Sequence, residues 1–302
     1  MSGSITNHIR PTPDIVNPLY NLKHVLKKIR WQGRRHIVAA KYGLSELNRT
    51  PAVLSNAMPK SGSHLIIQVL QGLTRLGPFV NPGFPPVNRD EVNEKLSQAE
   101  ILDNLRQMKP GDIAYGYLKA IKPFLSLLTQ PGRATIFLYR DPRDMIISHI
   151  FYASQIHKGH GMNQYYTENL HTMEERINAA IRGVNEPGLE LASIRSRYEG
   201  YLGWLEQPEV FCIRFEQLIL DRKAALAQIL DYLGMRGFRS QMGRDLEISI
   251  LEKAIVPKKS GTFRKGQAGN WREHFTEANK TFFKEQTGDL LTQLNYEHDT
   301  SW

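Results

Sequence analysis

Residues 57–65 read Ala57-Met58-Pro59-Lys60-Ser61-Gly62-Ser63-His64-Leu65, and they join a short apolar run to the start of a helix. The run before them, residues 52–57, predicts a buried strand. After them, apolar residues recur at positions 65, 66, 69, 70, 73 and 76. This period predicts a helix from His64 to Leu76 that Gly77-Pro78 stops.

The loop between this strand and this helix has the composition of a phosphate cradle. The first backbone N–H groups of a helix are unpaired, and the helix dipole favours an anion there. Gly62 lets the backbone approach a ligand closely, Ser61 and Ser63 add hydroxyl donors, and Lys60 adds a positive charge. An ordinary strand-to-helix turn with a capping serine is the alternative interpretation of the loop taken alone.

The loop differs from two common nucleotide-binding motifs. A Walker A motif ends in Gly-Lys-Ser or Gly-Lys-Thr, whereas Lys60 precedes the glycine and neither tripeptide occurs in the chain. The dinucleotide fingerprint Gly-x-Gly-x-x-Gly is also absent. Classical ATP hydrolysis and Rossmann-type redox chemistry therefore lose their main support.

Strand and helix patterns alternate along the chain from residue 50. Residues 134–139 and 210–215 predict two further buried strands. Asp141 is predicted to cap the helix that follows the first of them, and Asp221 a helix that ends at Gly234. Strands separated by helices predict an α/β fold, with a parallel sheet that carries helices on both faces.

Two later segments could supply the other cations of a phosphate site. Arg140 ends the strand at 134–139, and Ser148 lies two turns into the next helix. Arg264, Lys265 and Gly266 belong to a Gly-rich loop. Taken singly, the first segment is typical of a capped turn with surface ion pairs, and the second of a solvated basic loop. Ligands of open parallel sheets bind beyond the carboxyl ends of the strands, so the combination favours one anionic site.

Composition bounds the class of protein. The 302 residues carry a net charge of +9, which suits nucleic acid, an anionic membrane surface or anionic small molecules. No apolar window is long enough to span a membrane, and the single Cys212 fits a reducing compartment, so a cytoplasmic location is expected. Residues 1–49 are expected to form a flexible and basic helical extension, and residues 50–302 a single domain.

Three signatures in this order resemble the sulfotransferases that use 3′-phosphoadenosine 5′-phosphosulfate (PAPS). The first resembles Pro-Lys-Ser-Gly-Thr-Thr-Trp and reads here Pro59-Lys60-Ser61-Gly62-Ser63-His64-Leu65. The second, Arg140-Asp141-Pro142-Arg143-Asp144 followed by Ser148, is similar to the family's Arg-Asn/Asp-Pro-Lys/Arg-Asp. The third, Arg264-Lys265-Gly266 through Trp271, is similar to Arg-Lys-Gly-x-x-Gly-Asp-Trp. The resemblance spans about residues 50 to 295 and implies a three-layer, P-loop-like α/β fold.

The resemblance also implies a role for each matched residue. The donor's 5′-phosphosulfate would contact residues Lys60, Ser61, Gly62, Ser63, His64 and Leu65. The 3′-phosphate of PAPS, and of the product 3′-phosphoadenosine 5′-phosphate (PAP), would contact Arg140, Ser148, Arg264, Lys265 and Gly266. Phe215 stands where family members often carry a Tyr near the nucleotide. Lys60 would stabilise charge on the leaving phosphate oxygen.

The sequence departs from the family at two positions. Leu65 stands where a Trp usually packs on adenine, and Phe263 is a substitute for it. Tyr117 stands where a His usually takes the proton of the acceptor, and a phenol is a poor base at neutral pH. The other candidate bases are His64, which is nearest to Lys60 in sequence, and the histidines at positions 149, 157 and 160.

The expected reaction moves a sulfuryl group to a hydroxyl or amine of a small-molecule acceptor. The segments 78–112 and 157–188 interrupt the strand–helix rhythm and are expected to hold this acceptor. No metal is expected, because the sequence has no cluster of ligands at metal-binding spacing. Nucleic acid and stable membrane insertion are not expected either. The alternatives are another nucleotide-phosphate transferase, such as a kinase, and a basic nucleic-acid-binding module.

Overall fold

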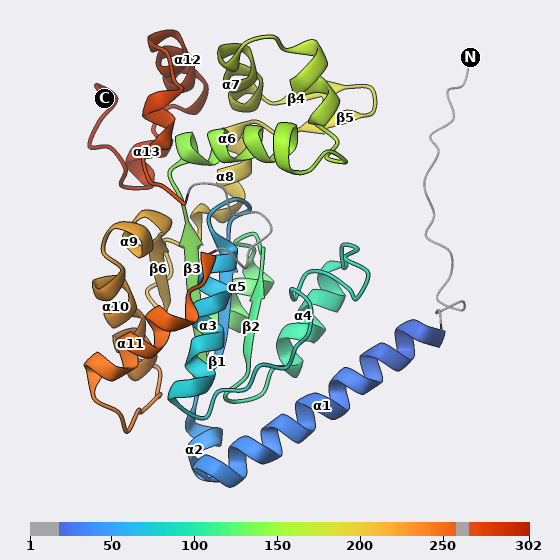
Figure 1. Cartoon of the computed structure of the whole chain (residues 1–302), viewed down its shortest axis with the longest axis vertical. Coiled ribbons are helices and arrows are strands. Elements are labelled where there is room, and N and C mark those ends of the chain that lie inside the picture. The colour runs from blue at the N-terminus through green and yellow to red at the C-terminus, as the bar shows by residue number, and fades with distance from the viewer. Residues whose placement is uncertain (1–17, 258–265) are drawn as a thin grey trace.

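A parallel sheet lies at the centre of the computed structural model, which describes residues 18–257 and 266–302 (Figure 1). Its four strands run in the order β2-β1-β3-β6. Their bounds are β1 Ala52–Ala57, β2 Ile113–Gly116, β3 Arg133–Tyr139 and β6 Val210–Arg214. In the register Ser55 of β1 lies beside Tyr115 of β2 and Ile136 of β3. The three strands expected from the sequence are therefore confirmed.

The two central strands are buried on both faces, as their continuous apolar composition predicts. Every residue of β1 is buried. Because successive side chains of a strand point to opposite faces, Val53 and Ile136 belong to one apolar cluster, and Leu54 and Phe137 to the other. The sheet thus separates two hydrophobic cores.

Helices cover both faces of the sheet and make the fold three-layered, as predicted. One core is closed by α3 Ser63–Leu76, α9 Phe215–Leu220, α10 Arg222–Met235 and α11 Arg244–Ala254. The other core is closed by α4 Gln98–Gln107, α5 Lys122–Leu128, α6 Pro142–Phe151 and α8 Ile194–Leu202.

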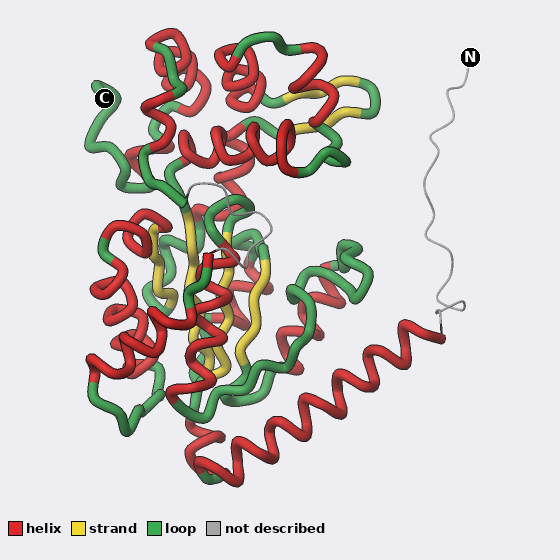
Figure 2. Tube along the Cα trace, in the orientation of Figure 1, coloured by secondary structure: helices red, strands yellow, loops and turns green. Residues whose placement is uncertain are grey.

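A helical layer lies beyond the carboxyl ends of the strands, at the top of Figures 1 and 2. This layer continues from α6 and contains a helix within residues 157–188, together with a short antiparallel hairpin that the sequence pattern did not indicate. Its elements are the π-helices η1 Tyr152–Ile156 and η2 Tyr165–Asn169, α7 Met173–Arg182, β4 Val184–Glu186, β5 Leu189–Leu191, the 3-10 helix η4 Asn270–Glu273, α12 Glu277–Thr287 and α13 Leu290–Gln293.

The basic N-terminal region forms α1 Pro18–Tyr42, which runs obliquely past the sheet, and the short α2 Leu44–Arg49 (Figure 1). Trp31 is buried beneath α1, and its indole N–H donates to Asp112 Oδ1 at 2.9 Å. Arg35 forms an ion pair with the same carboxylate at 2.9 Å. These contacts anchor one face of α1 to the segment before β2.

Two helix boundaries differ from the sequence prediction. Asp221 does cap α10, accepting a hydrogen bond from the Ala224 N–H at 3.4 Å, but the helix continues through Gly234 to Met235. The chain turns instead at Gly237, which has φ 106°. Phe215, expected to end β6, is the first residue of α9. Glycine in a helix costs only about 1 kcal/mol, and the buried residues of α10 that precede Gly234 offset that cost.

Candidate active site

The loop between β1 and α3 holds two residues in the left-handed region. Lys60 has φ 67° and Gly62 has φ 89°. A positive φ at a lysine is strained, and such strain is concentrated at functional sites. Ser61 holds the turn, because its N–H and its hydroxyl both donate to the Met58 carbonyl, at 3.1 Å and 2.6 Å. Both Ser61 donors are engaged inside the loop, so its predicted contact with a ligand stays a prediction.

A cavity of about 720 Å³ opens beside this loop, at the carboxyl ends of the strands. It brings together most of the residues singled out from the sequence. These are Lys60, Gly62, Ser63, His64, Leu65, Tyr117, Arg140, Ser148, Phe215 and Gly266. Of the other expected residues, Ser61 is buried and does not line the cavity, and Phe263, Arg264 and Lys265 lie outside the described residues. Segments that are far apart in the sequence therefore share one cavity.

Lys60 is a cation without a carboxylate partner in the described part of the chain. Burial alone lowers the pKa of Lys60 to about 7. Its Nζ lies 2.8 Å from the centroid of the Tyr152 ring, whose face attracts a cation. Burial, and secondarily the charge of Lys60, lowers the pKa of the neighbouring His64 as well. An anion in the cavity would restore the charge of Lys60.

Tyr152 is a site residue that the sequence analysis missed. It begins η1, and π-helical turns are frequent at functional sites. The His157 ring stacks on Tyr152 at 5.5 Å between centroids, and the His160 ring meets it edge-on at 5.8 Å. Only the position of Tyr152, one turn after Ser148, could have indicated that it faces the cavity.

The candidate histidines differ in whether they line the cavity. His149 is buried and does not line the cavity, and its pKa is lowered to about 3, mainly by burial. His160 lines the cavity, and burial followed by the charges of His157 and Lys60 lowers its pKa. His157 packs on Tyr152 outside the lining. A buried imidazole with such a low pKa is a weak base, which disfavours His149 and leaves His64 and His160.

Tyr117 follows β2 directly. Its hydroxyl donates to Ser63 Oγ at 2.9 Å, at the first turn of α3. Its backbone N–H donates to the Asn88 side chain at 3.2 Å. The phenol is therefore held at the helix N-terminus that faces the cavity.

Arg140, at the end of β3, reaches the same cavity from the other side of the loop. Its Nη2 donates to the Gln267 carbonyl at 3.0 Å and lies 3.5 Å from Asp144 Oδ2. Asp144 in turn accepts from the N–H groups of Gly269 and Trp271, each at 2.8 Å. Arg140 Nε is buried and has no hydrogen-bond partner in the described part of the chain. Asp144, another residue not predicted, thus ties the loop after Gly266 to β3.

Phe215 lies between the two cationic segments. The Arg140 guanidinium carbon lies 4.4 Å from the centroid of its ring. On the other side, a Cβ added to Gly62 would collide with the same ring. Gly62 is therefore required both by its backbone conformation and by the close approach of Phe215.

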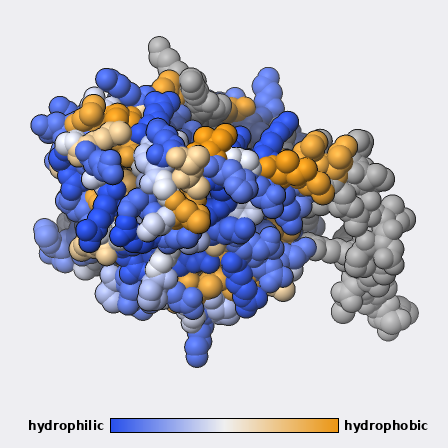
Figure 3. Space-filling view, turned by 90° about the horizontal axis from the view of Figure 1, so that it is seen from below, coloured by the Kyte–Doolittle hydropathy of each residue, from blue (hydrophilic) through white to orange (hydrophobic). Residues whose placement is uncertain are grey.

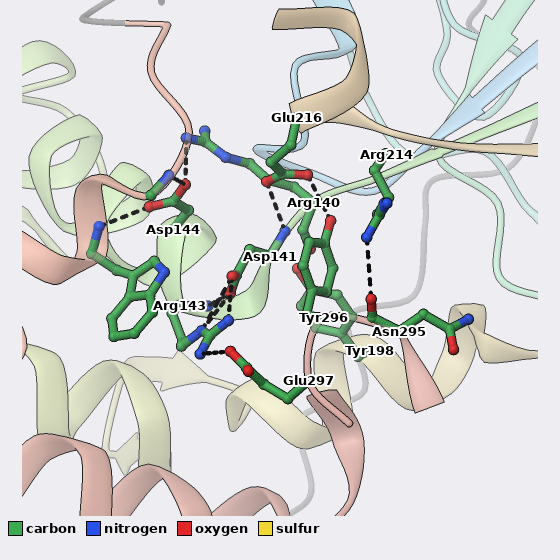
Figure 4. A network of polar contacts seen from close by, with 12 residues as sticks. Arg140, Asp141, Arg143, Asp144, Tyr198, Arg214, Glu216, Asn295, Tyr296 and Glu297 are labelled. Carbon is green, nitrogen blue, oxygen red and sulfur yellow. Dashed lines mark hydrogen bonds and ion pairs between the residues drawn. The ribbon is translucent and has the colours of Figure 1, made fainter. Parts of the chain in front are cut away.

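The rest of the Arg140–Asp144 motif is internal scaffold rather than cavity lining (Figure 4). Arg143 is 2 % exposed and forms two parallel bonds to Asp141, with Nε–Oδ1 at 2.9 Å and Nη2–Oδ2 at 2.7 Å. Its Nη1 donates to Glu297 at 2.5 Å. The rings of Trp271 and Trp302 lie 4.1 Å and 4.4 Å from its guanidinium carbon. The expected surface ion pairs are buried, because the C-terminal segment covers them.

The same network fixes the backbone of Arg140. The Tyr198 hydroxyl donates to the Arg140 carbonyl at 2.7 Å. Glu216 accepts from the Asp141 N–H at 3.1 Å and from the Tyr296 hydroxyl at 2.7 Å. Figure 4 shows these side chains converging on the end of β3. Three separate segments therefore determine where Arg140 lies.

A second cavity of about 400 Å³ adjoins the first. The two cavities share the lining residues Ile67, Pro86, Arg89 and Tyr115. The second lies between α1, the segment 81–115 and α3, and its wall includes Trp31, Phe84, Leu96 and Met108.

In the described residues no group of three or more His, Cys, Asp or Glu could hold a metal ion. That no metal takes part stays a prediction.

Comparison with known proteins points to one family. Residues 51–295 match the sulfotransferase domain. A guinea pig (Cavia porcellus) 3-alpha-hydroxysteroid sulfotransferase is 25 % identical over 162 residues, which are 49 % of this chain and 52 % of that protein. Sulfotransferase 2A6 of Mus musculus is 22 % identical over 248 residues, or 77 % of this chain and 81 % of that protein. The chain thus spans about half the length of the first relative and about four fifths of the second.

Solved structures share the fold. Mouse sulfotransferase SULT7A1, solved with PAP, superposes with a TM-score of 0.55 at 15 % identity, covering 87 % of this chain and 94 % of that one. Retinol dehydratase, solved with androsterone and PAP, has a TM-score of 0.53 at 14 % identity, covering 82 % and 83 %. At these identities the likeness concerns the fold, and it agrees with the three-layer architecture.

Proposed function

The chain belongs to the sulfotransferase family, and on that premise we propose that it moves a sulfuryl group from PAPS to a hydroxyl or amine of a small-molecule acceptor. One observation supports this most strongly. Lys60 and Arg140 converge on one cavity from two strand ends, and each retains unused capacity for an anion. PAPS, which carries several negative charges in two phosphate regions, is the kind of ligand that such a cavity suits.

The proposed donor contacts follow the two sides of the cavity. Lys60, Ser63, His64 and the N–H groups at the start of α3 would bind the 5′-phosphosulfate. The 3′-phosphate would lie at Arg140 and Ser148, with the loop of Arg264, Lys265 and Gly266 beside it. Phe215, between Gly62 and Arg140, would pack near the nucleotide.

Lys60 has the main catalytic role in this proposal. In-line transfer of the sulfuryl group breaks its bond to the phosphate oxygen, and negative charge develops on that oxygen. A preorganised cation beside the oxygen stabilises this charge most in the transition state. Phosphate oxygens near Lys60 would raise its pKa from about 7, so that it is charged when the donor is bound.

The acceptor would occupy the region where the two cavities meet. The second cavity has a size typical of small-molecule sites and an aromatic wall. Proteins of the same fold have been solved with androsterone and with retinol, which supports an acceptor of that size. Tyr117 would take or position the acceptor's proton, and His64 and His160 are the alternatives within the same cavity.

Two further expectations belong to this proposal. A cytoplasmic location is supported by the single Cys212. No metal is required, because the positive charge at the reacting phosphate comes from Lys60.

The kinase alternative lacks a Walker A motif. A nucleic-acid-binding module would carry its cations along one open face, whereas Lys60 and Arg140 line a cavity.

A thermal-shift comparison tests the donor assignment. PAP should raise the melting temperature far more than ADP, because Arg140, Ser148 and the 264–266 loop would contact only the 3′-phosphate. Loss of two charge-assisted contacts should weaken binding by roughly 3–6 kcal/mol. ATP and a short oligonucleotide are the other two ligands whose effect on the melting temperature is compared. Equal stabilisation by PAP and ADP would reject PAPS as the donor, and a larger effect of ATP or of the oligonucleotide would favour one of the alternatives.

A further inference from the structure

Helix α1 carries a row of large apolar side chains that point away from the protein. Leu22, Val25, Leu26, Ile29 and Ile37 are between 42 % and 69 % exposed. Their spacing places them on one face of the helix, since each residue turns it by about 100°. In Figure 3 the orange side chains that run toward the grey N-terminal residues lie over this helix. We call these five residues the outer stripe.

The opposite face of α1 is docked, so the outer stripe cannot turn inward. Trp31 is only 7 % exposed and bonds to Asp112. Arg35 pairs with Asp112, and Lys27 pairs with Glu91, whose carboxylate is largely buried. An aromatic anchor and two ion pairs thus fix the rotation of the helix about its axis. Among the described residues, the stripe therefore stays on the outer face of the helix.

The charges beside the stripe have one sign. Between residues 18 and 42 the sequence has seven Lys or Arg, at positions 23, 27, 28, 30, 34, 35 and 41, and no Asp or Glu. Lys27 and Arg35 form ion pairs with the rest of the protein, and Arg34 donates to the Asn81 carbonyl at 2.6 Å. Lys28, Arg30 and Lys41 are exposed, and the helical period puts them on the flanks of the stripe. A second copy of α1 packed on the stripe would bring like charges together, whereas an anionic lipid surface complements them.

We propose that α1 lies in the plane of an anionic membrane surface, with the outer stripe in the boundary between head groups and acyl chains. An apolar face flanked by Lys and Arg is the pattern of interfacial helices. Among the described residues, no helix is long and apolar enough to span a membrane. The net charge of +9 adds long-range attraction. This inference does not depend on the proposed reaction.

Vesicle co-sedimentation of the full chain tests the proposal directly. Vesicles of phosphatidylcholine mixed with phosphatidylserine should bind the protein, and pure phosphatidylcholine vesicles should bind it much more weakly. Added salt should weaken binding to the mixed vesicles. Equal binding to the two kinds of vesicle, or none to either, would overturn the proposal.

Paired variants separate the stripe from the general charge of the protein. Ile29→Ser with Ile37→Ser should weaken vesicle binding at least about tenfold. Lys28→Gln with Arg30→Gln should weaken it by about fivefold for each charge removed. The matched controls are Leu220→Ser, an exposed apolar residue elsewhere, and Lys223→Gln with Lys253→Gln. These controls should bind nearly as the unchanged protein does.

The remaining outcomes decide against the outer stripe as a membrane contact. Stripe variants that bind vesicles like the controls would show that charge alone acts. A concentration-dependent dimer that the Ile29→Ser, Ile37→Ser variant abolishes, in a protein that does not bind vesicles, would assign the stripe to a second copy of the chain. The melting temperature of each variant shows whether it is folded, and exposed substitutions should leave it within a few degrees.

Discussion

Two strand ends meet at the cavity, and they use their charged residues in opposite ways. The loop after β1 leaves Lys60 without an ion-pair partner in the described residues, in a strained conformation and with a pKa lowered to about 7. The motif after β3 satisfies its charges internally, with Arg143 enclosed by two carboxylates and two indole rings. Only Arg140 of that motif reaches the cavity.

This difference shows that charged residues in a signature do not share one role. A buried cation with its hydrogen bonds made contributes to the scaffold, and a buried cation without them is available to a ligand. On this basis Arg143 holds the C-terminal segment against β3, whereas Lys60 and Arg140 are available to an anion. Substitution of Arg143 should therefore lower stability, whereas substitution of Lys60 or Arg140 should affect turnover or ligand binding.

The largest effect is expected at Arg143. Arg143→Met would leave the buried Asp141 and the half-buried Glu297 without their cation, and should lower the free energy of unfolding by about 3–5 kcal/mol. Urea unfolding monitored by circular dichroism measures it. Arg140→Met is the matched control from the same motif, and it should mainly weaken PAP binding. Equal destabilisation by the two variants would contradict the division between scaffold and site.

Lys60 should affect turnover rather than folding. Lys60→Ala removes the cation from the leaving oxygen and should reduce kcat by about 10²–10³ at saturating PAPS. Transfer of labelled sulfate from PAPS to an acceptor, found in a panel of steroids, phenols and amines, measures kcat. Lys158→Ala, an exposed lysine after η1, is the control. Unchanged turnover in the Lys60 variant would make Lys60 a binding residue at most.

The pH dependence of PAP binding should report the lowered pKa of Lys60. Below pH about 7 Lys60 is already protonated, so its contribution to affinity is constant. Above that pH a proton must be taken up on binding, and affinity should fall by up to about tenfold per pH unit. The stability of the free protein follows the opposite trend with pH. Between pH about 7 and about 10.5 the unfolded state binds more protons at Lys60 than the folded state does, so the Lys60 contribution to the free energy of unfolding rises across this range.

Isothermal titration of PAP across this pH range, with Lys60→Met as the reference, measures the effect. The reference variant retains the titration of the ligand itself and loses only that of Lys60. Parallel pH profiles for the two proteins would show that Lys60 does not change protonation when PAP binds.

The last expected effect concerns Tyr117, whose role two histidines could fill instead. Tyr117→Phe removes the hydroxyl that contacts Ser63 and should slow transfer by about 10²-fold if that hydroxyl moves the proton. If His64 or His160 is the base, Tyr117→Phe should change little, and the rate should instead rise with pH below about 6.5, because the pKa of each imidazole is lowered. A pH–rate profile of Tyr117→Phe, His64→Ala and His160→Ala distinguishes these cases.

Local sequence predicted much of the fold and many of the residues that line the cavity. The apolar runs at 52–57 and 134–139 are typical of strands that are buried on both faces of a parallel sheet. Such strands need helices on both faces of the sheet, and this requirement predicts the three-layer architecture. Gly62 can adopt the left-handed conformation that most residues avoid, and the fixed φ of Pro142 suits the first position of a helix. Because parallel strands present their carboxyl ends at one edge, the neighbourhood of Lys60 and Arg140 was also predictable.

The roles of individual side chains depended on contacts between distant segments. Arg140 and Arg143 are chemically identical and three residues apart, and only the positions of Trp271, Glu297 and Trp302 make one a scaffold residue. Tyr152 reaches Lys60 through a π-helical turn that no apolar period signals. Sequence alone thus determined which charges gather at the sheet edge, because parallel strands that each lead into a helix present their carboxyl ends at one edge of the sheet. Tertiary packing decided which of those charges remain free for a ligand, because burial and partnership are properties of the assembled structure.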